Sequence, residues 1–159
     1  MTSLLPLFQW ANNLWVADWV RKSTWIFPAA ETVHIVALAV LFGTVVFVDL
    51  QVLGLVRRDT PASHLEKELR PWTFSSLIVI LFTGALLFSS EALKLYINVP
   101  FQFKIVTLFI AIVFNYTIHR SVIGMEPVRL GPVWGKLTAA ISIALWLSVG
   151  FAGRAIGFF

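Results

Sequence analysis

The sequence contains no cysteine and only two methionines. The lack of cysteine excludes disulfide bonds, iron–sulfur clusters and thiolate metal sites. Any redox chemistry must therefore come from a bound cofactor. Met1 and Met125 both lie outside the long apolar runs, which argues against a methionine-lined copper pathway.

Charge is also scarce, since charged residues make up 13% of the chain, hydrophobic residues make up 58% and the mean hydropathy is +0.85. This composition is typical of an integral membrane protein. Four stretches each approach or exceed the ~20 residues that span a bilayer as a helix. Their runs are continuously apolar rather than alternating, which favours helices over a β-barrel. The sequence predicts an all-α fold, a four-helix transmembrane bundle over residues 25–159, with spans at 25–56, 71–90, 101–119 and 136–159.

The first 24 residues lack the basic start and small-residue cleavage site of a signal peptide. Their tryptophans, Trp10, Trp15 and Trp19, alternate with polar side chains, as in a helix lying at the level of the lipid headgroups. Pro6 suits the first turn of such a helix. We expect residues 1–24 to form an interfacial amphipathic helix ahead of the transmembrane domain.

Basic residues are more frequent in the loops that follow the first and third spans than on the opposite side. Cytoplasmic loops carry the excess of Lys and Arg, so this bias predicts a bacterial inner membrane protein with both termini periplasmic. The net charge of +4 is explained by interfacial cations that meet anionic headgroups. The expected partner is therefore the lipid bilayer, and no nucleic acid is required.

One histidine lies inside the first span. The seventeen residues between Glu31 and Asp49 carry no formal charge, but His34 is among them, one helical turn from Glu31. An ionisable side chain at membrane depth indicates a functional site, and imidazole is the commonest side-chain ligand of metals. Glu31 lies on the same helix face and could orient the ring. The simpler alternative is a hydrogen bond to a neighbouring carboxylate or hydroxyl, which stabilises a membrane bundle by ~0.6 kcal/mol.

Other polar residues reach the same depth on the remaining helices. Counting along each span places Lys104, Arg154 and Glu91 in the layer of His34. Lys104 and Asn115 are eleven residues apart and share a helix face. Asn115, with Trp146 on the fourth span, is the candidate for the floor of a pocket below this layer.

A second polar layer is expected at the other membrane face. His119 belongs there, roughly 20 Å from the depth of His34, so the two imidazoles cannot bind one metal ion. Asp49 lies near the same face, where we expect it to cap the boundary or to pair with Arg57, and a proton relay is the alternative. His64 is expected in a solvated, charged loop.

Two segments together resemble a known family. The segment from Glu31 to Gly43 (ETVHIVALAVLFG) and the segment PFQFKIVTL around Lys104 look like the His-helix and Lys-helix pair of the HemJ-type protoporphyrinogen oxidases. More broadly, the chain is similar to bacterial membrane proteins of the copper-resistance-D class, with Asp49-Leu50 ending the first helix and Gly153-Arg154 near the C-terminus.

The resemblance implies that His34 binds haem b and that Lys104 is needed for activity. The chain departs from the HemJ-type proteins near the end of its first helix, where it has Val48-Asp49-Leu50 in place of a Pro-Arg pair. This departure weighs against porphyrinogen oxidation more than against haem binding.

These observations lead to one hypothesis and two alternatives. The hypothesis is a haem b protein for electron transfer or for oxidation of a membrane-borne quinone or porphyrin-like substrate, with His34 as iron ligand and Lys104 as candidate catalytic residue. Further cofactor-binding candidates are Lys104, Arg154, Glu31, Asn115 and Trp146. The alternatives are a permease for copper or a small solute, and an accessory subunit of a larger membrane complex. A Gly153-x-x-x-Gly157 spacing permits a homo-oligomer.

Overall fold

The computed structural model describes residues 4–56, 59–124 and 127–158, and the part it describes is helical without a strand. The all-α prediction is therefore confirmed. The chain forms α1 (Leu5–Asn12), α2 (Trp15–Lys22), α3 (Ile26–Val52), α4 (Ala62–Tyr96) and α5 (Val99–Phe114). A π-helical turn (Asn115–His119), α6 (Arg120–Gly124), α7 (Pro127–Ala155) and a 3-10 turn (Ile156–Phe158) follow.

Four helical stretches among the described residues are long and apolar enough to cross a membrane: Ile26–Val52, Ala62–Tyr96, Val99–Gly124 and Val133–Phe158. Many of their large apolar side chains point outward, including those of Phe82 and Phe109, which are 66% and 68% exposed. Such exposure is costly in water and ordinary in lipid. The protein is a multi-pass membrane protein built on a helical bundle.

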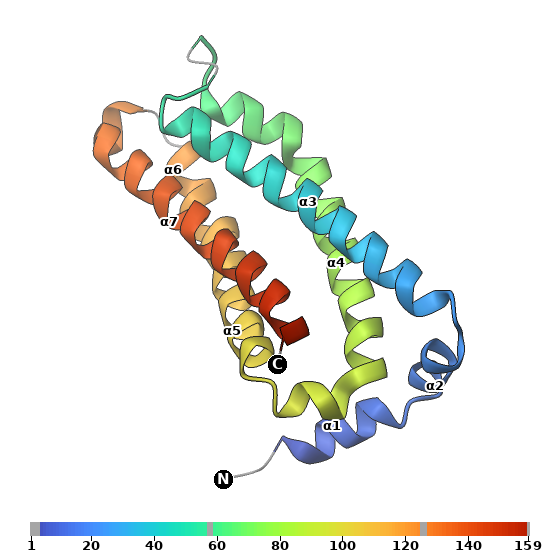
Figure 1. Cartoon of the computed structure of the whole chain (residues 1–159). Helices are drawn as coiled ribbons and strands as arrows, with labels where there is room; N and C mark the ends of the chain where they lie inside the picture. The colour runs from blue at the N-terminus through green and yellow to red at the C-terminus, as the bar shows by residue number, and fades with distance from the viewer. Residues whose placement is uncertain (1–3, 57–58, 125–126, 159) are drawn as a thin grey trace.

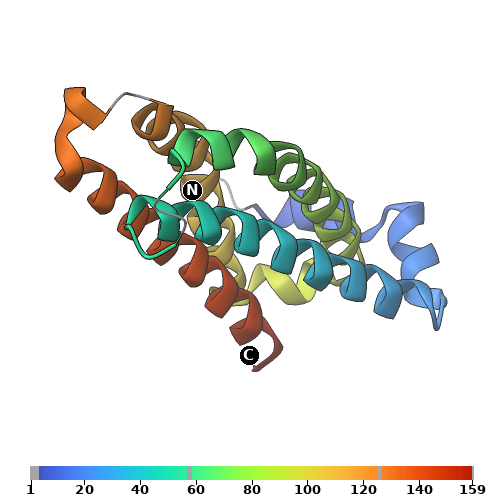
Figure 2. The same cartoon turned by 90° about the horizontal axis from the view of Figure 1, so that it is seen from above.

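The bundle consists of two helix pairs (Figure 1). In one pair α3 lies along α4, and in the other α5 lies along α7. Seen from above, α3 lies between α4 and α7 (Figure 2), and it contacts both. The two pairs meet at the end of the bundle that carries α6, here called the α6 end. They separate toward the opposite end, here called the α1 end, where the bent end of α4 crosses between the pairs and leads into α5.

An apolar core joins the pairs midway along the bundle. Leu41 of α3, Ala111 of α5 and Trp146 of α7 are among its most buried members, each 3% exposed or less. Leu77 and Ile80 add the contribution of α4. Because this core fills the centre, any polar site must lie toward one end or the other.

The N-terminal segment forms two short helices rather than the single amphipathic helix expected over residues 1–24. α1 ends at Asn12 and α2 begins at Trp15 after an extended residue, Leu14. Pro6 lies in the first turn of α1, as predicted. The break follows a pair of asparagines, which favour turns because their side chains compete for backbone hydrogen bonds. Trp15 is 77% exposed, as the expected position at the headgroups requires.

These two helices pack beneath a bend in α4. The backbone of Glu91 leaves helical geometry (φ −125°, ψ 22°), which bends the end of α4 toward α1. Phe8 of α1 packs edge-on against Phe88 and Tyr96, with ring centroids 5.1 and 5.2 Å away. The bend helps to hold the α1 end of the two pairs apart.

The helices extend beyond the apolar runs at the α6 end. α4 begins at Ala62, so the prediction that His64 lies in a loop is wrong. Ion pairs one turn apart support this charged first part of α4: His64 with Glu68 at 3.5 Å, and Arg70 with Glu66 at 3.2 Å. α7 likewise begins at Pro127 rather than near residue 136. Hydropathy detects only the part of a helix that faces lipid.

Candidate functional site

The hydrogen bond of His34 is made with a helix neighbour rather than with its own helix. Its Nδ1 lies 2.8 Å from Oγ1 of Thr83 on α4. The Thr83 hydroxyl donates its hydrogen to the carbonyl of Val79, 2.7 Å away, so its oxygen is left to accept from His34. This network assigns the proton to Nδ1. In the neutral ring, the lone pair is then on Nε2.

A glycine makes room for this ring. A Cβ atom at Gly84, the residue after Thr83, would lie 3.3 Å from Cε1 of His34. The imidazole therefore lies directly against the backbone of α4. Thr83 fixes the ring by a hydrogen bond and Gly84 by its lack of a side chain, and both features come from one turn of one helix.

Lys104 faces this site from the other helix pair. It is half-buried on α5, and its Nζ lies 3.4 Å from where a Cβ of Gly153 on α7 would be. It makes no hydrogen bond or ion pair among the residues that the structure describes. Lys104 is close enough to His34 for its charge to act on the imidazole. A glycine on α4 thus lies behind the imidazole, and a glycine on α7 lies behind the amine.

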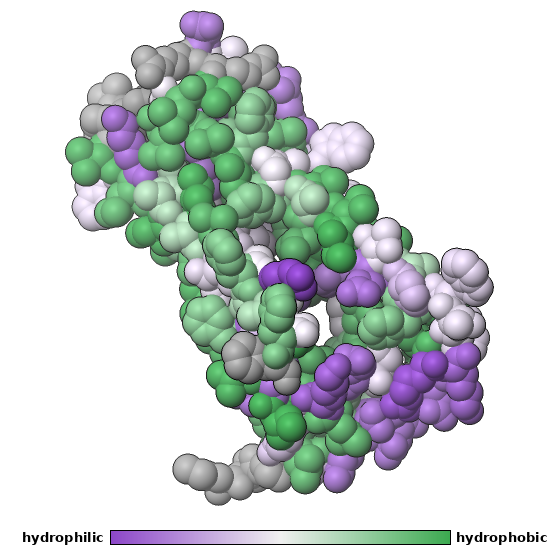
Figure 3. Space-filling view, in the orientation of Figure 1, coloured by the Kyte–Doolittle hydropathy of each residue, from purple (hydrophilic) through white to green (hydrophobic). Residues whose placement is uncertain are grey.

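The space between the helix pairs is open at this end of the molecule. Figure 3 shows a passage through the space-filling surface where the pairs have separated, bordered by both hydrophilic and hydrophobic atoms. Its walls come from facing pairs rather than from one helix contact.

The remaining residues predicted for this layer are arranged differently. Glu31 is exposed, and the partner that orients the His34 ring is Thr83, which corrects the expectation for Glu31. The reason is that α4 runs alongside α3, so its hydroxyl is closer than a carboxylate one turn back. Glu91 pairs with Lys94 at 3.7 Å. Arg154 is exposed, and its guanidinium lies 4.8 Å from the ring centroid of Phe158.

Asn115 and Trp146 do not form the floor of the His34 site as one surface. Trp146 belongs to the apolar core, with Leu41 and Ala111. Asn115 is buried on the far side of that core, where it lines a small cavity with His119. Lys104 and Asn115 are eleven residues apart and so point in similar directions from the helix axis. They nevertheless lie about 16 Å apart along the helix, on opposite sides of the core.

A buried hydrogen-bonded pair occupies the α6 end. Nε2 of His119 lies 2.5 Å from Oδ1 of Asp49, and the two residues are 3% and 0% exposed. The expectation that Asp49 pairs with Arg57 is not tested, because Arg57 lies outside the described residues. The sequence predicts Asp49 and His119 at the same membrane face. This shared depth is the signal from which their pairing could be predicted. The separation of His119 from His34 is confirmed, since Asp49 lies fifteen residues, about 22 Å, farther along α3 than His34.

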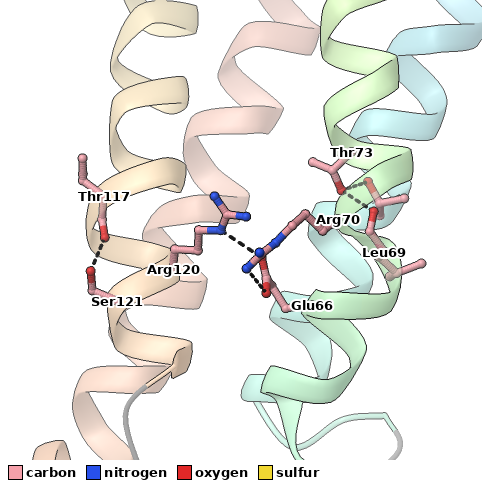
Figure 4. A network of polar contacts seen from close by, with 8 residues as sticks. Glu66, Leu69, Arg70, Thr73, Thr117, Arg120 and Ser121 are labelled. Atoms are coloured by element: carbon pink, nitrogen blue, oxygen red, sulfur yellow. Dashed lines mark hydrogen bonds and ion pairs between the residues drawn. The ribbon is translucent and has the colours of Figure 1, made fainter.

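Beside this pair lies a charged cluster of Glu66, Arg70 and Arg120 (Figure 4). Glu66 accepts hydrogen bonds from Arg70 of its own helix and from Arg120 of α6, at 3.1 to 3.3 Å. Among the described residues, a cavity of about 30 Å³, roughly one water molecule, lies between this cluster and His119. Sequence reasoning missed the cluster, because Glu66 and Arg70 were assigned to a loop.

No group of three or more His, Cys, Asp or Glu side chains gathers in the described part of the chain in a way that could hold a metal ion. His34 can therefore supply one ligand to a metal whose other ligands come with it, as the nitrogens of a porphyrin do. The free Nε2, the facing amine and the open space are the features that such a cofactor requires.

No curated protein and no solved structure shows detectable similarity to this chain. A family model does match it, over residues 7–159, and this range includes both polar layers. The chain belongs to the family of unknown function DUF6644.

Proposed function

We propose that this protein is a haem b-binding protein of the bacterial inner membrane, which acts in electron transfer or in the oxidation of a membrane-borne quinone or porphyrin-like substrate. The observation that carries the proposal is the hydrogen bond from His34 Nδ1 to Thr83. Histidines that bind metals almost always donate their other ring N–H to a neighbouring acceptor, which fixes the tautomer and the orientation of the ring. In His34 this arrangement leaves Nε2 as the ligand atom.

The facing residues fit the periphery of the same group. Haem carries two anionic propionates, which bind best to cations at the membrane interface. Lys104, without another partner among the described residues, and the exposed Arg154 lie on the opposite helix pair. Lys104 is also the candidate for the sixth position or for a step with the substrate. Bound haem would supply a one-electron redox centre, and these residues would hold and orient it.

Glu31 and Trp146 have smaller parts in this proposal. Glu31 is exposed one turn from His34, where it could shape the charge at the entrance. Trp146 closes the apolar core below the site. Asn115 lies beyond that core and is not included in the cofactor site.

The permease alternative requires a polar path from His34 to Asp49. Leu41, Ala111 and Trp146 lie between the two polar layers and are almost fully buried. The described side chains therefore offer no such path, and we do not propose transport.

An absorption spectrum of the detergent-purified protein, oxidised and then reduced with dithionite, tests the haem proposal. The expected result is a Soret band and a reduced α-band that disappear in His34→Ala. His64→Ala is the matched control, because His64 is exposed at the α6 end and should leave the spectrum unchanged. A colourless wild-type protein after haem-supplemented expression contradicts the proposal, as does a haem spectrum that survives in His34→Ala.

The proposed orientation has a separate test, which the lack of native cysteine makes clean. Ser23→Cys lies between α2 and α3, and Ser63→Cys lies in the first turn of α4. In intact spheroplasts a membrane-impermeant maleimide should label the first and spare the second. The reverse pattern contradicts periplasmic termini.

A further inference from the structure

At the α6 end, a groove opens between α4 and the helix formed by α5, the π-helical turn and α6. It has a volume of about 530 Å³ and is lined by Arg70, Pro71, Phe74, Tyr116 and Arg120. The volume lies in the range of small-molecule sites, about 300–1,000 Å³.

The polar end of this groove has an excess of positive charge. Glu66 is the carboxylate paired with both arginines, at 3.2 Å from Arg70 and 3.1 Å from Arg120. One negative charge therefore meets two positive charges. Both arginines are partly exposed, with half of the Arg70 side chain and about a third of the Arg120 side chain open to the surroundings.

Several guanidinium N–H groups are left to bind a ligand. Arg70 uses Nε and Nη2 on Glu66, and Arg120 uses Nε. Nη1 of Arg70 and both terminal nitrogens of Arg120 make no hydrogen bond among the described residues. Figure 4 shows the terminal nitrogens of Arg120 pointing away from Glu66. The guanidinium of Arg120 also lies over the ring of Tyr116, with Cζ 5.3 Å from the ring centroid.

The rest of the groove is apolar and faces the lipid. Phe74 lies one turn deeper on α4 than Arg70 and is 53% exposed. Pro71 lies between them and has no backbone N–H to satisfy. A ligand in this groove would meet cations at one end and an apolar wall along its length.

We propose that this groove is a binding site for an anionic phospholipid, with the phosphate on Arg70 and Arg120 and an acyl chain along Phe74. Guanidinium groups bind phosphate oxygens through paired N–H donors, and basic pockets between transmembrane helices bind lipid headgroups. The net positive charge of the cluster selects an anionic lipid over a zwitterionic one. This site lies across the apolar core from His34 and does not depend on haem.

Native mass spectrometry of the purified protein with phosphatidylglycerol or phosphatidylcholine tests the site. The protein should retain phosphatidylglycerol in preference to phosphatidylcholine. A basic residue near a membrane contributes about fivefold to binding, so the double variant Arg70→Gln/Arg120→Gln should bind phosphatidylglycerol about 25-fold more weakly. Lys67→Gln is the control, because Lys67 is an exposed cation of α4 outside the groove lining. Equal retention of the two lipids, or equal retention by the double variant and the parent, overturns the proposal.

Two further arms keep the test decisive. Glu66→Gln removes the competing carboxylate and should increase phosphatidylglycerol binding severalfold, a gain that misfolding cannot produce. A loss of binding in Glu66→Gln, with an unchanged melting temperature, overturns the proposal. Inorganic phosphate, added at the same molar concentration as the phosphatidylglycerol, should not displace the lipid. If it does, the groove is a free-anion site and the lipid assignment is wrong.

Discussion

The imidazole of His119 meets the carboxylate of Asp49 in the interior of the bundle, 2.5 Å apart and almost without exposure. The contact joins α3 to the π-helical turn at the end of α5. Oγ of Ser142 on α7 is also buried and lies beside the carboxylate of Asp49. The pair is thus a buried polar link between the two helix pairs, next to the link from Glu66 of α4 to Arg120 of α6.

Loss of one member of this pair should destabilise the protein strongly. Asp49→Ala leaves a buried imidazole, and His119→Ala leaves a buried carboxylate. Breaking a buried pair from one side costs about 3–5 kcal/mol, because the remaining group keeps its desolvation penalty. Unfolding in mixed detergent micelles should show a loss of this size in the free energy of unfolding.

The double variant Asp49→Leu/His119→Leu is the control for this prediction. It removes both polar groups, so its free energy of unfolding should lie well above that of either single variant. If the double variant is as unstable as the two single losses added together, the two residues do not act as a pair.

The two glycines behind the His34 site should respond differently to a methyl group. In Gly84→Ala the new Cβ would lie 3.3 Å from a ring atom of His34 that the bond to Thr83 holds in place. In Gly153→Ala the nearest atom, at 3.4 Å, is the end of the flexible Lys104 side chain. We expect Gly84→Ala to shift the ¹⁵N resonances of His34 and Gly153→Ala to leave them in place.

Gly43→Ala is the matched control on α3, because nothing lies within 4 Å of its Cβ position. Gly43→Ala should leave the His34 resonances unchanged. It should not lower the melting temperature, because alanine is more favourable than glycine in a helix by about 1 kcal/mol. Identical His34 spectra in Gly84→Ala and Gly43→Ala would show that the ring does not lie against α4 as described.

Hydropathy and helical periodicity predict where helices lie along the chain, but they do not predict how the helices pack. Hydropathy found four spans, and the helical rise placed His34 and His119 at different depths. Neither measure reports which helices are neighbours. The Thr83 partner, the bend at Glu91 and the loose contact of α4 with α5 depend on packing, so they could not be predicted from one sequence. The charged first turns of α4 were missed because they carry no apolar signal.

The short helix α2 should respond to acid. Asp18 is exposed, and its pKa is lowered from the ordinary value of 3.8 by a hydrogen bond from Arg21 and by the charge of Lys22. A lowered pKa in the folded state means that the ion pair stabilises the fold above pH 3.8 and that this contribution is lost as the pH falls through the folded-state value. Arg21 also holds Asn12 of α1, at 2.7 Å.

The measurement for α2 is a carboxyl ¹³C titration of Asp18 in micelles. Arg21→Gln should move the pKa of Asp18 upward, toward its ordinary value, because the largest cause of the shift is removed. Lys94→Gln is a control of equal charge change, since Lys94 pairs with Glu91 instead. An unchanged Asp18 titration in Arg21→Gln contradicts the assignment of the shift to that hydrogen bond.

The acceptor on α4 gives the sharpest separation between a structural and a ligand role for His34. Thr83→Val keeps the shape of the side chain and removes the oxygen that accepts from Nδ1. The ring then loses the bond that fixes its tautomer. If His34 binds haem iron through Nε2, the affinity for haem should fall by about 10–100-fold, as for other partners that orient a ligating histidine.

Thr83→Ser keeps the hydroxyl and should retain both the haem and the Nδ1–H tautomer, which ¹⁵N chemical shifts of His34 report without any cofactor. The tautomer readout tests the hydrogen bond, and the haem titration tests the ligand role. If Thr83→Val changes the tautomer but not the haem affinity, the hydrogen bond has only a structural role, as a link between α3 and α4. His34 is then not a residue of the cofactor site. Joint loss of both in Thr83→Val, with both kept in Thr83→Ser, indicates that the same bond orients the ligand, because serine keeps the hydroxyl of Thr83 and valine keeps its branched shape without it.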